Sequence, residues 1–129
     1  PALGPAGAAK GGHSALCSRL IEDGANVNSV AGRDESTPLM HGLRGSSTTG
    51  SSTTVTVLLD AGADVGVRNR FGTLALHVAV WCGASVETIS LLLRSGAAAQ
   101  IDTKNEFGYS PASIAAEKGR ADVSALFAR

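Results

Sequence analysis

Apolar positions in the middle of the chain recur at helical spacing. Leu76, Ala79 and Val80 stand at i, i+3 and i+4, which places them on one face of a helix. A second apolar stripe follows Gly83, at Val86, Ile89, Leu92 and Leu93. Gly96 is expected to end that second helix, because glycine readily adopts the positive φ found at helix C-termini. The pattern predicts two short helices joined by a turn.

The preceding part of the chain predicts a second helix of the same kind, with apolar positions at Val55, Leu58 and Leu59. We expect Gly62 to close this helix, and Thr53 or Thr54 to cap its start. Pro38 and Pro111 are expected in the first turn of two further helices, where the missing N–H of proline is tolerated. Pairs of short helices cannot bury their apolar faces alone, so neighbouring pairs must stack.

Two phrases alternate along the sequence at a similar period. One reads LIEDGANVN, LLDAGADVG and LLRSGAAAQ, at residues 20–28, 58–66 and 92–100. The other reads STPLM, TLALH and YSPAS, at residues 36–40, 73–77 and 109–113. The glycines of the first phrase lie 38 and then 34 residues apart. Two interleaved phrases at one rough period indicate an array of repeated units.

These phrases resemble the ankyrin repeat, whose pattern is GxTPLHxAAxxG followed by a helix ending in LLxxGAxxN. The resemblance implies an all-α fold, a solenoid of stacked helix-turn-helix units joined by β-hairpin-like loops. It covers almost the whole chain as a single domain, residues 1–129. We expect the repeats at about residues 1–33, 34–70, 71–106 and 107–129, the last one partial.

The sequence departs from the ankyrin pattern in two stretches. Residues 6–12 are rich in glycine where the first helix of repeat 1 belongs, and interior glycine disfavours helix, so we expect that helix to be short or frayed. Residues 45–54, GSSTTGSSTT, lie between the two helices of repeat 2. Their composition predicts a flexible polar loop, and a phosphorylation or partner-contact loop is the alternative.

The TPLH cap at the start of each unit is also incomplete. His77 occupies the histidine position in repeat 3, but Leu74 replaces the threonine. Repeat 2 has Thr37 and Pro38, with Met40 in place of the histidine. Half of the cap is missing in each, which predicts modest stability.

Composition and charge narrow the classes of function. Eleven basic and eleven acidic residues give a net charge of zero, which argues against nucleic acid as a partner. No apolar run approaches the length of a membrane span, and no signal peptide is visible. Cys17 and Cys82 show no metal-site or disulfide spacing. We therefore expect a reducing, intracellular location, cytoplasmic or nuclear, with no membrane contact.

Candidate catalytic residues are few. The histidines are His13, His41 and His77, and their spacing matches no metal-binding motif. Cys17 lies on the apolar side of an expected helix and is interpreted as a buried structural thiol. The glycine-rich stretches match no phosphate-binding loop. We predict no enzyme, no cofactor and no small-molecule substrate, with catalysis by Cys82 and His77 as a competing hypothesis.

The ankyrin resemblance implies a protein–protein interaction module that binds a partner protein on the concave face, formed by hairpin tips and first helices. The residues that this implies as partner-binding are Arg33, Asp34, Arg44, Arg68, Arg70, Phe71, Trp81, Tyr109 and Lys118. Further candidates on the same face are Ser36, Thr73, Cys82, Glu106, Phe107 and Glu117. Trp, Tyr and Arg are the residue types most enriched at binding hot spots.

Alternatives remain open for several of these residues. Phe71 and Phe107 are equally expected to pack between adjacent hairpins, and Trp81 to pack under a neighbouring helix. Arg68 and Arg70 are positioned to meet an acidic ligand. Asn28 resembles an ankyrin site of asparagine hydroxylation. The chain as a whole has a second interpretation, a structural segment of a larger ankyrin-containing protein such as a channel, a kinase or a chromatin factor.

Overall fold

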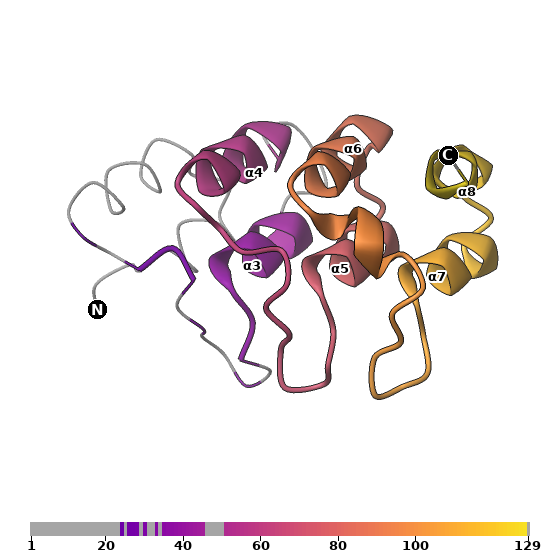
Figure 1. Ribbon diagram of the computed structural model, residues 1–129, viewed down its shortest axis with the longest axis horizontal. Coiled ribbons are helices and arrows are strands. Elements are labelled where there is room, and N and C mark those ends of the chain that lie inside the picture. Colours follow the sequence, from indigo (N-terminus) through magenta and orange to yellow (C-terminus); the bar gives the residue numbers. More distant parts are fainter. Residues whose placement is uncertain are drawn as a thin grey trace.

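The computed structural model describes residues 24, 26–28, 30, 33, 35–45 and 51–128. The expected frayed helix at residues 6–12 and the expected buried thiol of Cys17 lie outside this part of the chain. The described residues form short helices in pairs (Figure 1). They are α3 (Pro38–Gly45), α4 (Ser51–Asp60), α5 (Ala75–Trp81), α6 (Val86–Arg94), the 3-10 helix η1 (Ala97–Gln100), α7 (Pro111–Glu117) and α8 (Ala121–Phe127).

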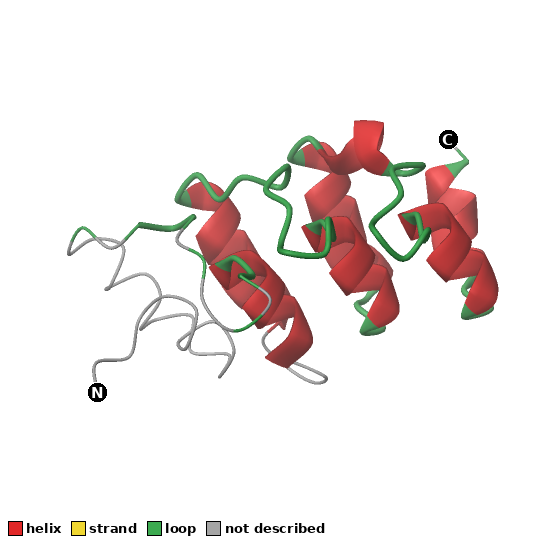
Figure 2. Ribbon diagram, turned by 90° about the horizontal axis from the view of Figure 1, so that it is seen from below, coloured by secondary structure: helices red, strands yellow, loops and turns green. Residues whose placement is uncertain are grey.

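The helices stack in two layers. Helices α3, α5 and α7 form one row, and α4, α6 and α8 form the other. Each helix contacts its own partner and its neighbours in the same row, and Figure 2 shows the three pairs side by side. The loops that precede α5 and α7 extend away from both rows, on the side of the first helices (Figure 1). This arrangement is the all-α solenoid predicted from the sequence.

The core lies between the two layers and confirms most of the predicted apolar stripes. Leu76, Ala79 and Val80 are buried, as are Ile89 and Leu92. Other members of the core are Leu39, Met40, Leu43, Val55, Leu58, Ile114, Ala115 and Val123. Burying a Leu, Ile or Val side chain contributes about 1.5–3 kcal/mol, so packing between units holds these short helices in place.

The helix starts differ from expectation in repeat 2. Helix α4 begins at Ser51, so Thr53 and Thr54 lie inside the helix and do not cap it, and residues 51–54 are not loop. No proline or glycine stands between Ser51 and Val55 to stop the helix, so it extends backward from its buried residues by one turn. Residues 46–50 of the expected polar loop lie outside the described part of the chain.

The first helices begin as predicted, with Pro38 opening α3 and Pro111 opening α7. In α3 the Thr37 Oγ1 accepts a hydrogen bond from the Met40 N–H at 3.3 Å. In α5 the Leu74 N–H donates to His77 Nδ1 at 3.1 Å. Each unit therefore keeps one half of the cap, as the sequence predicts. Repeat 4 has both halves, because Ser110 and Ser113 exchange hydrogen bonds of 2.9 and 3.1 Å.

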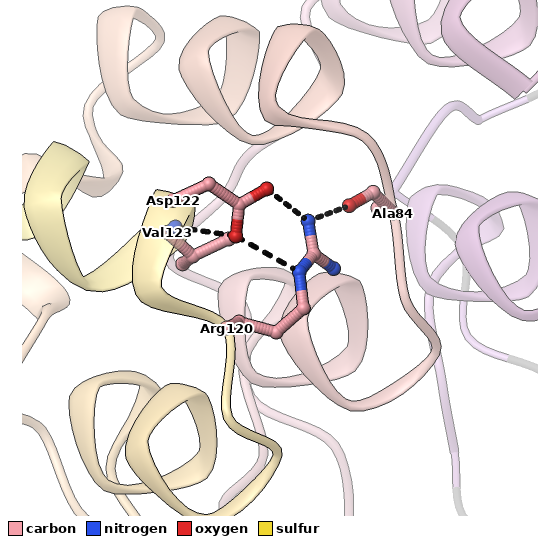
Figure 3. A network of polar contacts seen from close by, with 4 residues as sticks. All are labelled: Ala84, Arg120, Asp122 and Val123. Atoms are coloured by element: carbon pink, nitrogen blue, oxygen red, sulfur yellow. Dashed lines mark hydrogen bonds and ion pairs between the residues drawn. The ribbon is translucent and has the colours of Figure 1, made fainter.

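Arg120 fastens the last helical pair to the one before it (Figure 3). Its guanidinium donates to the backbone carbonyl of Ala84 at 3.1 Å and pairs with the Asp122 carboxylate at 3.1 Å. Asp122 also accepts from the Val123 N–H at 2.8 Å. The Arg120 hydrogen bond, followed by that of Val123, lowers the pKa of Asp122. The carboxylate thus stays charged and keeps the guanidinium oriented toward Ala84.

Candidate functional site

Two loops, residues 68–73 and 104–109, are each closed by an asparagine at the same position. The Asn69 Oδ1 accepts from the backbone N–H groups of Phe71 and Thr73, at 2.9 and 3.0 Å. The Asn105 Oδ1 accepts from the N–H groups of Phe107 and Tyr109, at 3.0 and 3.1 Å. Asparagine favours such turns because its short side chain reaches the backbone two residues on. Both loops therefore present their aromatic residues in the same way.

The loops are also joined to each other and to the preceding unit. The Glu106 N–H donates to the Phe71 carbonyl at 2.9 Å, and Asn105 Nδ2 donates to Thr73 Oγ1 at 3.2 Å. Asn69 Nδ2 donates to Ser36 Oγ at 3.4 Å. Ser36 is fully buried, which corrects its expected place on the binding surface. Its hydroxyl is turned inward to the neighbouring loop.

A groove of about 330 Å³ lies where repeat 3 meets repeat 4. The Phe71 and Phe107 rings lie 5.4 Å apart, and those of Trp81 and Tyr109 lie 6.5 Å apart. Each pair spans two repeats. The residues that line the groove are Asn69, Phe71, Thr73, His77, Val78, Trp81, Cys82, Asn105, Phe107, Tyr109 and Ile114. This surface is apolar and aromatic, with a few fixed polar groups, which is typical of binding sites.

The aromatic residues keep much of their surface in solvent. Trp81 is 53% exposed and Phe107 is 63% exposed. Packing of Trp81 under a neighbouring helix, the alternative considered for it, is therefore wrong. The two phenylalanine rings contact each other across adjacent loops, but neither ring is buried between them. That contact leaves Phe71 37% exposed, so both rings remain accessible to a partner.

Lys118 adds a positive charge to the aromatic surface. Its ammonium lies 4.2 Å from the centre of the Trp81 ring, within the range of a cation–π interaction. Lys118 follows the end of α7 and Trp81 is the last residue of α5, so this contact joins neighbouring units as the ring pairs do.

His77 lies on the floor of the groove and is buried. Its Nδ1 accepts from the Leu74 N–H, so the proton resides on Nε2, which donates to the Tyr109 carbonyl at 2.8 Å. Burial lowers the pKa of His77, hydrogen bonding to the Tyr109 and Thr103 backbone opposes this, and the positive charge of Arg68 lowers it further. The imidazole is neutral and both nitrogens are occupied. It is therefore not placed to act as a base on the exposed Cys82 thiol.

The remaining predicted residues lie around the groove or away from it. Arg68 and Arg70 are exposed and flank Asn69 without lining the groove, and Arg33 is exposed on the preceding unit. Asp34 and the Arg44 side chain lie outside the described residues. The structure thus brings together four of the predicted residues, Phe71, Trp81, Tyr109 and Lys118. Arg68 and Arg70 lie outside the lining of the groove.

Asn28, expected to be a modification site, has a defined contact with the next unit. Its Oδ1 accepts from the Asp64 N–H at 2.8 Å, and its Nδ2 donates to the Gly62 carbonyl at 3.4 Å. Both bonds fasten one loop to the next. Hydroxylation at this residue stays a prediction.

Sequence reasoning missed the roles of Asn69 and Asn105. A signal was present, because NRFG at 69–72 and NEFG at 105–108 repeat the same spacing of asparagine, phenylalanine and glycine. The asparagine holds the loop that presents the phenylalanine, so the two residues recur together.

Comparison with known families agrees with the helical stacking. A family model described as "Ankyrin repeats (3 copies)" matches residues 45–128, well over half of the chain. This chain belongs to the ankyrin repeat family. Its ankyrin units place the aromatic groove between the loops and the first helices, on the face that the sequence resemblance implied. Protein interaction is the role typical of this family.

The ankyrin chain is also similar to short segments of plant potassium channels. It is 39% identical over 70 residues to potassium channel AKT1 of Oryza sativa subsp. indica, and 36% identical over 66 residues to potassium channel AKT1 of Arabidopsis thaliana. The matches cover 54% and 51% of this chain but only 7% of each channel. The likeness is thus confined to a small part of a much larger protein.

The described residues also bear on a membrane span and on a metal site. No helix among them has the length and apolar character needed to cross a membrane. In the same part of the chain, no three His, Cys, Asp or Glu side chains come together as a metal site.

Proposed function

We propose that this ankyrin domain is a non-catalytic module that binds a partner protein in the groove between repeats 3 and 4. The observation that carries the proposal is the pair of aromatic contacts, Phe71–Phe107 and Trp81–Tyr109, which line an accessible groove of about 330 Å³. Large aromatic side chains supply much of the free energy of protein association when a partner covers them.

The geometry of the groove supports binding better than catalysis. His77 has both ring nitrogens engaged with backbone groups, which leaves Cys82 without that residue as a base. The loops are fastened by Asn69, Asn105 and the Glu106–Phe71 backbone bond. A preorganised surface loses little conformational entropy when a partner binds, and this favours high affinity.

Crosslinking of the chain to its partner in lysate of its native cells tests this proposal. We expect crosslinked peptides from residues 68–82 and 104–118, and at least a tenfold loss of capture with Trp81→Ala. Arg94→Ala on α6, in the opposite layer, is the matched control and should capture the partner normally. Crosslinks confined to α4, α6 and α8, with Trp81→Ala harmless, would contradict the proposal.

A second candidate is that the domain is an interaction segment of a larger protein, a channel among the possibilities. The observation that favours it is the match to 7% of each potassium channel AKT1. The full reading frame around residues 1–129 decides the matter, because a continuous frame with further domains supports it and a short isolated frame contradicts it. We further propose an intracellular location, in the cytoplasm or the nucleus.

A further inference from the structure

We infer that the groove takes a peptide segment of the partner in which a bulky apolar side chain stands next to acidic residues. This inference rests on the proposed function and adds the chemistry of the ligand. It is carried by the juxtaposition of an uncharged aromatic floor with the exposed Arg68 and Arg70, which lie on a loop beside that floor.

The floor of the groove selects for an apolar side chain. None of its lining residues is acidic, and His77 is neutral. Val78 and Ile114 are buried, and they line the groove together with the exposed rings of Trp81 and Phe107. A volume of about 330 Å³ accommodates a Leu, Met or Phe side chain with adjoining backbone, and burying such a side chain against aromatic rings is favourable.

The loop that leads into repeat 3 is positively charged. From Gly66 to Ser85 the chain contains Arg68 and Arg70 and no acidic residue. Both arginines are exposed, and in the described part of the chain neither forms an ion pair. The Arg68 charge reaches as far as His77 on the floor. Two exposed guanidinium groups without a carboxylate partner favour an anionic group beside the groove.

The loop that leads into repeat 4, together with the end of α7, carries charges of both signs. Asp102, Glu106 and Glu117 offset the charges of Lys104 and Lys118, and the Lys118 ammonium is already engaged by Trp81. The two loops and the end of α7 together thus bear four positive and three negative charges, and the excess positive charge lies at Arg68 and Arg70. We therefore place the acidic residues of the ligand beside Arg68 and Arg70, and the apolar side chain between the aromatic pairs.

Selection of random twelve-residue peptides displayed on phage, against the whole chain, tests the inference. We expect enrichment of Asp or Glu within three positions of Leu, Met or Phe, and loss of these peptides in a parallel selection against Trp81→Ala. Binding of a synthetic selected peptide is then followed by the fluorescence of Trp81, which is the only tryptophan in the chain.

Charge variants locate the acidic residues of the ligand. Arg68→Gln and Arg70→Gln should each weaken the dissociation constant about two- to fivefold, the range of an exposed ion pair. Glu106→Gln is the matched control and should leave binding unchanged or strengthen it. All three side chains are exposed, and circular dichroism checks that each variant is folded.

The outcomes separate the inference from the proposed function. Peptides that require Trp81 but are neutral or basic, or that bind the arginine variants normally, overturn the inference and leave the proposed function standing. Peptides that ignore Trp81→Ala, or no enrichment at all, overturn both.

Discussion

Glu35 adopts a backbone conformation that its side chain disfavours. It precedes Ser36 just as Gly72 precedes Thr73 and Gly108 precedes Tyr109. Its φ is 56°, close to the values of 72° and 83° at those glycines. The left-handed conformation recurs at this position in all three units, but in this one a residue with a Cβ atom occupies it. Such a residue costs about 1–2 kcal/mol there.

Replacement Glu35→Gly is therefore expected to stabilise the domain. Relief of the left-handed strain exceeds the extra freedom of glycine in the unfolded chain, about 0.5–1 kcal/mol, so the free energy of unfolding should rise by about 0.5–1 kcal/mol in urea titrations. Gly108→Ala is the converse control and should lose stability, since its Cβ would meet no atom within 4 Å and only the backbone conformation opposes it. An unchanged or lower urea midpoint for Glu35→Gly would argue against strain at this position.

At the scale of the elements, the second helices and their closing glycines were predictable, and the loops were not. Gly96 has a φ of 116° after a stripe that includes the buried Ile89 and Leu92, and its spacing from Gly62 is visible in the sequence. Helical periodicity specifies such features because the same few positions must pack in every unit.

The candidate site was predictable only in part. Trp81, Tyr109 and Phe71 were expected on one face, yet their contacts depend on how Asn69 and Asn105 fold the loops. The inward turn of Ser36 depends on Asn69 of the next unit. Contacts between residues about 33 positions apart arise from the stacking of units. They cannot be predicted from the pattern of polar residues within one unit.

The two hydrogen bonds of His77, in helix α5, should make the stability of the domain sensitive to pH. His77 accepts from Leu74 and donates to Tyr109, and burial lowers its pKa in the folded state. Between that pKa and the ordinary value of about 6.5, the unfolded chain binds more protons than the folded chain. The contribution of His77 is therefore complete above about pH 6.5 and falls as the pH falls below it.

Urea midpoints at pH 7.5 and pH 5.5 measure this contribution. The midpoint of the natural chain should drop at pH 5.5, because a charged imidazole cannot accept from the Leu74 N–H. In His77→Asn, the amide oxygen still accepts that hydrogen bond and the titrating group is gone, so the drop should be smaller. Equal drops in the two proteins would show that other groups cause the acid sensitivity.

For the molecule as a whole, the last unit depends on Arg120 for its attachment. The guanidinium reaches both the Ala84 carbonyl and the Asp122 carboxylate, and a lysine ammonium lacks that forked geometry. We expect Arg120→Lys to speed hydrogen exchange in residues 121–127 while α5 remains protected. Arg94→Lys, an exposed change on α6, should leave both regions unaffected. Equal exchange in Arg120→Lys and the natural chain would mean that apolar packing alone holds α8.

The two ring pairs described above cross a joint between units, which has a consequence for how the solenoid responds to a partner. A partner that contacts both repeats stabilises the interface between them. If the two repeats separate, the surface that the partner binds is lost. By mass action, a hundredfold excess over the dissociation constant adds about 2.7 kcal/mol against such opening. Dissociation of the partner and opening of the C-terminal unit are then thermodynamically coupled.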